Sequence, residues 1–164
     1  MIEVLSAQVG AALKSHGLML VTAESCTGGG VAQAITDIAG SSAWFERGFV
    51  TYSNHAKLQM LGVSATTLLQ HGAVSEAVVR EMVSGALAHS EAQVALSVSG
   101  IAGPDGGTPD KPVGTVWFAW QLQSGVRISR VHYLQGSRAE VRAQAVAIAL
   151  QGVLDILANR SVTA

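Results

Sequence analysis

Cysteine, basic clusters and long apolar runs are scarce in this sequence of 164 residues. Its one cysteine, Cys26, cannot form an intramolecular disulfide, and no Cys and His residues have the spacing of a zinc site. We therefore predict neither a disulfide framework nor a bound metal. A reducing compartment fits this use of cysteine.

The balance of charge gives no sign of a polyanionic partner. Ten Lys and Arg stand against eleven Asp and Glu, and no basic run or basic and aromatic stripe occurs. Nucleic-acid binding needs such a basic footprint, so we predict no nucleic-acid partner. No apolar stretch reaches the roughly 18 residues that span a membrane, and the N-terminus is amphipathic, with Glu3 where a signal peptide is basic. We predict a cytoplasmic protein without a membrane partner.

Hydrophobic residues, in contrast, are plentiful. They make up 49% of the chain, whereas charged residues make up 13%, against a usual share of about 25%. The length is about that of one domain and is enough for a full core. We predict a single domain over residues 1–164 that, having little solvated surface, forms a homo-oligomer.

Apolar periodicity and turn residues predict alternating helices and strands. Helices are expected at 2–15, from the turn after residue 25 to about 38, from a cap at Ser53-Asn54 to Gly62, after Ser64, at 76–89 and from Ser137 to about 157. Strands are expected at 18–22, 48–52, 94–99, 113–121 and 126–134, the last two as an antiparallel hairpin. This order predicts an α/β fold, a three-layer α/β/α sandwich around a mixed, mainly parallel central sheet.

The stretch Thr-Ala-Glu-Ser-Cys-Thr-Gly-Gly-Gly, residues 22–30, places Ser25 where a buried strand passes into a helix. There, unpaired backbone N–H groups and the positive end of the helix dipole converge on a side-chain oxygen or a bound anion. The glycines form no Walker motif and no full dinucleotide fingerprint, but they leave room for one phosphate at backbone N–H groups. The other interpretation is that Ser25 or Thr27 only caps the helix.

Junctions rich in glycine or serine follow the strands that end near Val21, Tyr52 and Ser99. If these strands are parallel, the junctions meet at one edge of the sheet, where open α/β sheets bind ligands. The loop at 100–112 holds all three prolines and is expected to form a rigid wall of this edge; the alternative interpretation is a linker, because Pro and Gly also mark boundaries. The polar residues that gather there are Ser25, Cys26, Thr27, Tyr52, Asn54, Lys57, Ser99, Asp105 and Arg138.

Two candidate nucleophiles and several candidate bases lie in this group. A serine hydroxyl such as that of Ser25 is a weak nucleophile until a base takes its proton. Lys57 is such a base only if desolvation or a nearby cation lowers its pKa, and otherwise it is a solvated helix lysine. Cys26 is intrinsically the better nucleophile, but a free cysteine beside a strand is most often a small buried hydrophobe. The other candidate bases are Glu24, Tyr52 and His55.

Five segments resemble the CinA C-terminal domain family, in order and at family-like spacing. They are Thr-Ala-Glu-Ser-Cys-Thr-Gly-Gly (22–29), Tyr-Ser-Asn-His-Ala-Lys (52–57), Gly-Ala-Val-Ser (72–75), Ser-Gly-Ile-Ala-Gly-Pro-Asp-Gly-Gly-Thr-Pro-Asp-Lys-Pro-Val-Gly-Thr-Val (99–116) and Gly-Ser-Arg (136–138). This family includes stand-alone nicotinamide-nucleotide amidases. The resemblance therefore implies hydrolysis of the carboxamide of nicotinamide mononucleotide to nicotinate mononucleotide and ammonia, without metal or cofactor.

The resemblance also implies roles for individual residues. Ser25 is then the nucleophile and Lys57 the base, with Tyr52 beside the pair to orient it. Ser99 stands where threonine is more usual, a change that keeps the hydroxyl. The residues expected to contact the substrate nucleotide are Thr27, Gly28, Gly29, Ser42, Asn54, Ser99 and Arg138.

Two other functions fit the same residues. A regulatory module of the same fold would bind a pyridine nucleotide without turnover, because its lysine stays protonated. Alternatively, the pocket acts on another amide or ester, or uses Cys26 as its nucleophile.

Overall fold

The computed structural model describes the backbone of residues 1–163 and the side chains of residues 1–159. Its elements are α1 (Ile2–Ser15), β1 (Leu20–Glu24), α2 (Gly30–Thr36), the short 3-10 helix η1 (Ser41–Ala43), β2 (Phe45–Val50), α3 (Asn54–Leu61), α4 (Ala65–His71), α5 (Glu76–Ala88), β3 (Val94–Gly100), β4 (Thr115–Leu122), β5 (Arg127–Tyr133) and α6 (Arg138–Thr163).

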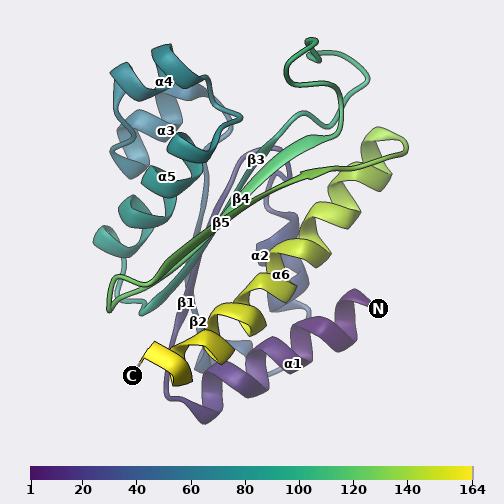
Figure 1. Cartoon of the computed structure of the whole chain (residues 1–164). Coiled ribbons are helices and arrows are strands. Elements are labelled where there is room, and N and C mark those ends of the chain that lie inside the picture. Colours follow the sequence, from purple (N-terminus) through teal and green to yellow (C-terminus); the bar gives the residue numbers. More distant parts are fainter. Residues whose placement is uncertain (164) are drawn as a thin grey trace.

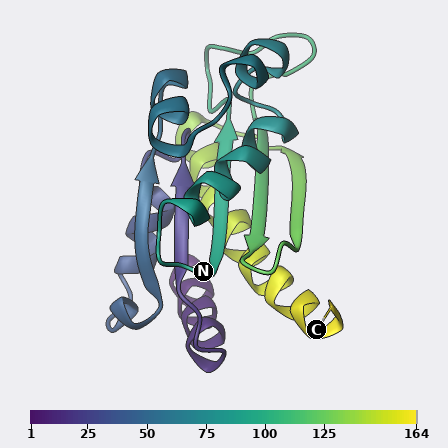
Figure 2. The same cartoon turned by 90° about the vertical axis from the view of Figure 1, so that its left-hand side faces the viewer.

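The strands form one sheet in the order β2-β1-β3-β4-β5. β1 pairs in parallel with β2 and β3, whereas β4 is antiparallel to both β3 and β5. Within this sheet four strands therefore run in one direction and β4 opposes them, as the arrows show (Figure 2). The predicted mixed, mainly parallel sheet with an antiparallel hairpin is confirmed.

Helices cover both faces of the sheet: α3, α4 and α5 lie on one side, and α1, α2 and α6 on the other (Figure 1). Successive side chains of a strand point to opposite faces of the sheet, so β3 contributes residues to two core clusters. Leu96 and Val98 join the cluster that includes α1, α2 and α6, and Ala95 joins the cluster of α5. The predicted three-layer sandwich is confirmed.

Local capping signals place most helix starts correctly. The hydroxyls of Ser53, Ser64 and Ser75 each accept a hydrogen bond from the N–H three residues further on. Ser137 and Glu140 exchange two hydrogen bonds, which form the capping box at the start of α6.

The bounds of the first two strands differ from those predicted. β1 is Leu20–Glu24 and not 18–22, because it pairs with β2 and β3 as far as Glu24. The hydrogen bonds to these two strands keep the polar residues Thr22 and Glu24 in an extended conformation. β1 thus lies later in the chain than predicted, whereas β2, predicted at 48–52, lies earlier, at Phe45–Val50. The ends of β1, β2 and β3 therefore lie level, with Glu24 opposite Val50 and Val98.

The stretch Arg138–Asn159 of α6 is long and apolar enough to cross a membrane by length and composition. The sequence prediction that no segment reaches this length overlooks it. Half of its most apolar window is buried inside the fold, where Val141, Ala145 and Ala149 pack against the sheet. Burial of this kind is typical of a core helix.

Close packing between α6 and β4 gives a test of the fold. A Cβ added at Gly152 would overlap the ring of Trp120, which is 1% exposed and fixed by its Nε1–H bond to the Ala149 carbonyl. We expect Gly152→Ala to lower the free energy of unfolding, because overpacking costs about 1–3 kcal/mol and offsets the roughly 1 kcal/mol that alanine gains in a helix. Urea unfolding followed by circular dichroism measures it. In a Trp120→Phe background the penalty should shrink, and an equal penalty in both backgrounds would contradict this explanation.

Candidate active site

A cavity of about 260 Å³ lies where the three parallel strands end. Its lining comes from the segments that follow β1 and β2, from the end of β3 and the loop after it, from α3, from the turn before α5 and from the start of α6. The residues are Ser25, Cys26, Tyr52, Asn54, Lys57, Ala73, Val74, Ser99, Gly100, Ala102 and Arg138. A second cavity, of about 370 Å³, is lined by Leu18, Gln93, Leu122, Gln123 and Ser124 and has no titratable group. The first cavity, which gathers Ser25, Lys57 and Arg138, is therefore the candidate site.

Ser25 and Lys57 meet in this cavity although 32 residues separate them. Ser25 comes directly after β1, and its N–H donates to the Val98 carbonyl of β3. Lys57 lies in the first turns of α3, a helix capped by Ser53 directly after β2. The side chain of Lys57 reaches back so that its Nζ is 3.0 Å from the Ser25 Oγ.

The amine of Lys57 is almost completely buried, at 1% exposure. Besides Ser25, its Nζ contacts the carbonyl oxygens of Thr51 at 2.9 Å and Tyr52 at 3.1 Å. Burial lowers the pKa of Lys57, and this outweighs the opposite effect of the Cys26 thiol. A neutral amine can donate to the two carbonyls and direct its lone pair at the Ser25 hydroxyl.

The thiol of Cys26 lies beside this pair but in a different environment. It is 5% exposed and belongs to the core cluster that includes α1, α2 and α6. Burial raises the pKa of the thiol to about 11, so it stays protonated near neutral pH. The interpretation of Cys26 as a small buried hydrophobe fits these surroundings.

Glu24 has a role that the sequence did not indicate. Its buried carboxylate accepts hydrogen bonds from the Thr27 hydroxyl at 2.5 Å and from the N–H groups of Val31 and Ala32 at 2.9 and 3.0 Å. It thereby occupies the N-terminus of α2, where an anion is most stable. Neither Ser25 nor Thr27 caps this helix, and the predicted room for a phosphate at its first N–H groups is filled.

Tyr52 takes part through its main chain. Its carbonyl accepts from Lys57 and lies 3.4 Å from the Ser25 Oγ. Its side chain is 63% exposed, and its hydroxyl is 3.4 Å from a guanidinium nitrogen of Arg138. The contacts of Tyr52 with Ser25 and Lys57 are therefore made by its carbonyl and not by its phenol ring. Arg138 also donates to the Gly103 carbonyl at 2.7 Å, which ties α6 to the loop after β3.

The structure brings six predicted site residues into one cavity: Ser25, Tyr52, Asn54, Lys57, Ser99 and Arg138. Thr27, Gly28 and Gly29 lie in the adjoining turn outside its lining, and Ser42 lies in η1, at the amino end of β2 and so at the opposite edge of the sheet.

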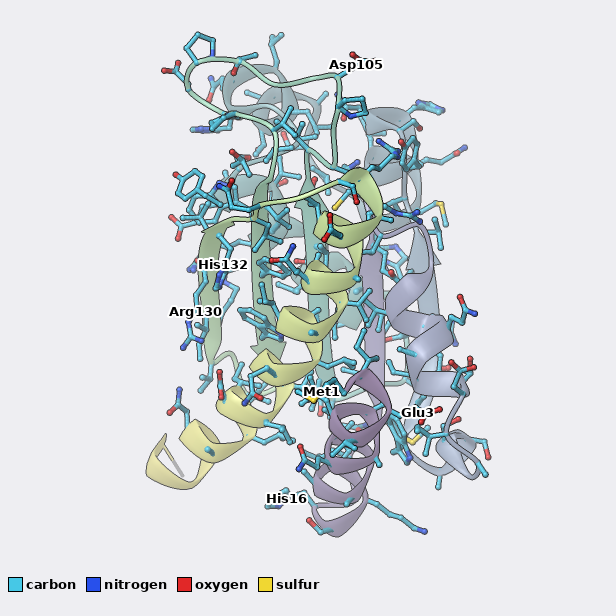
Figure 3. All side chains as sticks on the ribbon, turned by 90° about the vertical axis from the view of Figure 1, so that its right-hand side faces the viewer. Met1, Glu3, His16, Asp105, Arg130 and His132 are labelled. Carbon is cyan, nitrogen blue, oxygen red and sulfur yellow. The ribbon has the colours of Figure 1, made fainter. Side chains whose placement is uncertain are left out.

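Two further candidates also lie outside the cavity. His55 lines a separate hollow between α3 and α4. Asp105 lies on the exposed loop beyond the sheet (Figure 3). Among the described residues, no group of three or more His, Cys, Asp or Glu could hold a metal ion.

Comparison with known proteins relates this site to a family. The CinA C-terminal domain model matches residues 2–157. Nicotinamide-nucleotide amidohydrolase PncC of Escherichia coli (strain K12) is 65% identical over 147 residues, which cover 90% of this chain and 89% of the relative. The protein of the same name from Pseudomonas putida is 52% identical over 94% of this chain and 96% of its own length. A crystal structure of a competence-damaged protein (CinA) superfamily protein from Klebsiella pneumoniae matches with a TM-score of 0.93 and 42% identity, over 97% of this chain and 99% of that one. The chain belongs to the CinA C-terminal domain family.

Proposed function

We propose that this protein hydrolyses the carboxamide of nicotinamide mononucleotide to nicotinate mononucleotide and ammonia, with Ser25 as nucleophile and Lys57 as general base. The observation that carries the proposal is the 3.0 Å contact between the Lys57 Nζ and the Ser25 Oγ inside the cavity. The names of the PncC relatives from Escherichia coli and Pseudomonas putida support the choice of substrate.

The reaction proceeds in two halves. Neutral Lys57 takes the hydroxyl proton as the Ser25 Oγ attacks the carboxamide carbon, and the lysine ammonium then protonates the departing nitrogen, which leaves as ammonia. Water next attacks the resulting acyl ester while Lys57 again accepts a proton. Collapse of the second tetrahedral intermediate returns that proton to Ser25 and releases the nicotinate carboxylate.

The turn at 25–29 offers donors for the oxyanion. The N–H of Ser25 is used by Val98, and the N–H of Gly28 by the Ser25 carbonyl at 3.0 Å. In the described part of the chain, the N–H groups of Cys26 and Thr27 donate to no other residue. In α/β-hydrolases the N–H of the residue after the nucleophile is one oxyanion donor, and we assign the role of donor to the amides of Cys26 and Thr27 here.

The remaining polar groups suit a nucleotide. A guanidinium has five N–H donors, so Arg138, with two contacts made, still has donors for a substrate phosphate. The hydroxyl of Ser99 is 1% exposed, lines the cavity and makes no hydrogen bond to the described residues. In this proposal it contacts the carboxamide; Asn54 also lines the cavity.

We also propose that the protein is cytoplasmic. We further propose that it forms a homo-oligomer. Large apolar side chains on α3 and α4 are exposed in the single chain, with Leu58 at 41%, Met60 at 37% and Leu69 at 88%. Contact between copies of the chain would remove such side chains from water.

The first experiment measures ammonia release from nicotinamide mononucleotide by metal-free wild type, Ser25→Ala and Lys57→Met. We expect wild type to turn over and each variant to lose about 10²–10⁴-fold or more in kcat, because nucleophile or base is gone. Lys14→Met, which removes an exposed lysine from α1, is the matched control and should keep full activity. If wild type binds the nucleotide yet releases no ammonia, the regulatory-module interpretation replaces the amidase.

The pH dependence of kcat/KM reports the charge of Lys57. Only the neutral amine accepts the serine proton, so kcat/KM should rise with pH and level off once Lys57 has lost its proton. Because burial lowers the pKa of Lys57, that plateau should begin below the ordinary lysine value of about 10.4. Initial rates across a buffer series measure it. A profile that falls as pH rises through this window would contradict the role of base.

Alkylation with iodoacetamide separates Ser25 from Cys26 as nucleophile. With a pKa of about 11, only about one thiol in a thousand is ionised at pH 8, and the side chain is buried. We therefore expect the folded enzyme to keep its activity and mass spectrometry to find modified Cys26 only after unfolding. The variant Cys26→Ser should also remain active. Rapid modification with a matching loss of activity, slowed by substrate, would instead indicate a cysteine enzyme.

A further inference from the structure

We propose that Arg142 is a positioning residue for this reaction: it orients the peptide that follows the nucleophile, so that the Thr27 N–H is available to the oxyanion. The inference rests on the proposed function, in which Ser25 attacks the amide. Sequence reasoning did not single out Arg142, which lies one helical turn after Arg138 on α6.

The guanidinium of Arg142 contacts two consecutive carbonyl groups of the turn at 25–29. Its Nε donates to the Cys26 carbonyl at 3.1 Å, and its Nη2 donates to the Thr27 carbonyl at 3.3 Å. The turn lies close to the guanidinium: a Cβ added at Gly28 would be 3.3 Å from the Arg142 Nη2. Gly28 has a φ of +58°, a left-handed conformation that glycine adopts without strain.

Holding these carbonyls also fixes the N–H groups on the other side of each peptide. In a trans peptide the C=O and the following N–H point in opposite directions. The Cys26 carbonyl shares its peptide with the Thr27 N–H, so the bond from Arg142 turns that N–H away from α6. The next N–H, that of Gly28, is already bound to the Ser25 carbonyl.

The charge of Arg142 adds to this geometry. Among the described residues Arg142 forms no ion pair, and its two hydrogen bonds go to neutral carbonyls. A charge-assisted bond to the Cys26 carbonyl polarises the peptide and makes the Thr27 N–H a stronger donor. The positive charge therefore acts, through one peptide, where negative charge develops in the transition state.

Arg138 and Arg142, both on α6, contact different parts of the site. Arg138 reaches the loop carbonyl of Gly103 and the Tyr52 hydroxyl, at the lining of the cavity. Arg142 reaches the turn behind the nucleophile and does not line the cavity. Loss of Arg142 should thus lower kcat and leave substrate binding nearly intact.

The experiment compares wild type with Arg142→Ala and Arg142→Lys. Arg130→Ala is the matched control, because Arg130 also bonds α6, through Asp155, but far from the turn. Two readouts are taken: kcat and KM for nicotinamide mononucleotide, and the rate at which a fluorophosphonate probe labels Ser25, followed by mass spectrometry. As the Ser25 Oγ attacks the phosphorus and fluoride leaves, negative charge develops on the phosphoryl oxygen at the oxyanion donors, and this reaction needs no nucleotide binding. Thermal unfolding of each variant is recorded alongside.

We expect Arg142→Ala to lower kcat about 10- to 100-fold with KM nearly unchanged, less than the roughly 10²–10³ that loss of one oxyanion donor costs. Labelling of Ser25 should slow in parallel. Guanidinium chloride below denaturing concentration should restore part of both rates in Arg142→Ala. Arg142→Lys should stay impaired, because lysine has no planar fork to hold two carbonyls. Arg130→Ala should match wild type.

The outcomes separate the two proposals. If Arg142→Ala turns over and labels like wild type, or loses activity only in step with its stability and without guanidinium rescue, the role of Arg142 is overturned and the amidase stands. If wild type releases no ammonia but labels at Ser25 in a manner that depends on Arg142, the proposed substrate fails and the positioning role stands. If wild type neither turns over nor labels, Ser25 is not activated and both proposals fall.

Discussion

The amine of Lys57 is held inside the protein by neutral oxygen atoms, and the chemistry of the site depends on this. Within the described residues, two main-chain carbonyls and the Ser25 hydroxyl surround the Nζ, and no carboxylate forms an ion pair with it. A carboxylate at this place would stabilise the ammonium and raise the pKa of the lysine, which removes the base. Neutral acceptors satisfy the N–H groups of the buried amine and leave the charged form costly.

Those carbonyls keep their places because the ends of β1 and β2 are bonded together. The Thr51 N–H donates to the Glu24 carbonyl at 2.7 Å, and the Thr51 hydroxyl lies 3.3 Å from the same oxygen. The side chain of Glu24 also fixes the turn at 25–29, because its carboxylate accepts hydrogen bonds from the Thr27 hydroxyl and from N–H groups at the start of α2. Glu24, the last residue of β1, thus bonds both the turn that contains the proposed nucleophile and the segment whose carbonyls contact the Lys57 amine.

Much of the fold could be predicted because its signals are local. Serine caps, the hairpin and the alternation of apolar residues depend on near neighbours in sequence, and they placed Ser25 and Lys57 at the same edge. The contacts that were missed are not local. Every residue has a main-chain carbonyl, so the residue type at position 52 does not indicate that the Tyr52 carbonyl accepts a hydrogen bond from the Lys57 amine. The role of Glu24 was missed for another reason. Its polar side chain indicates that the strand has already ended, whereas pairing with β2 and β3 makes Glu24 the last residue of β1.

Ser25 and Cys26 show how backbone geometry chooses between two nucleophiles. The thiol is the stronger nucleophile once ionised, but ionisation needs a stabilised anion. At position 25 the hydroxyl lies 3.0 Å from the Lys57 amine, the base in the proposed reaction, whereas at position 26 the thiol packs into the core cluster and burial raises its pKa to about 11. The helix dipole that could have lowered that pKa is already engaged by the Glu24 carboxylate. Burial, and to a smaller extent the nearby Glu24 carboxylate, thus raise the pKa of the Cys26 thiol.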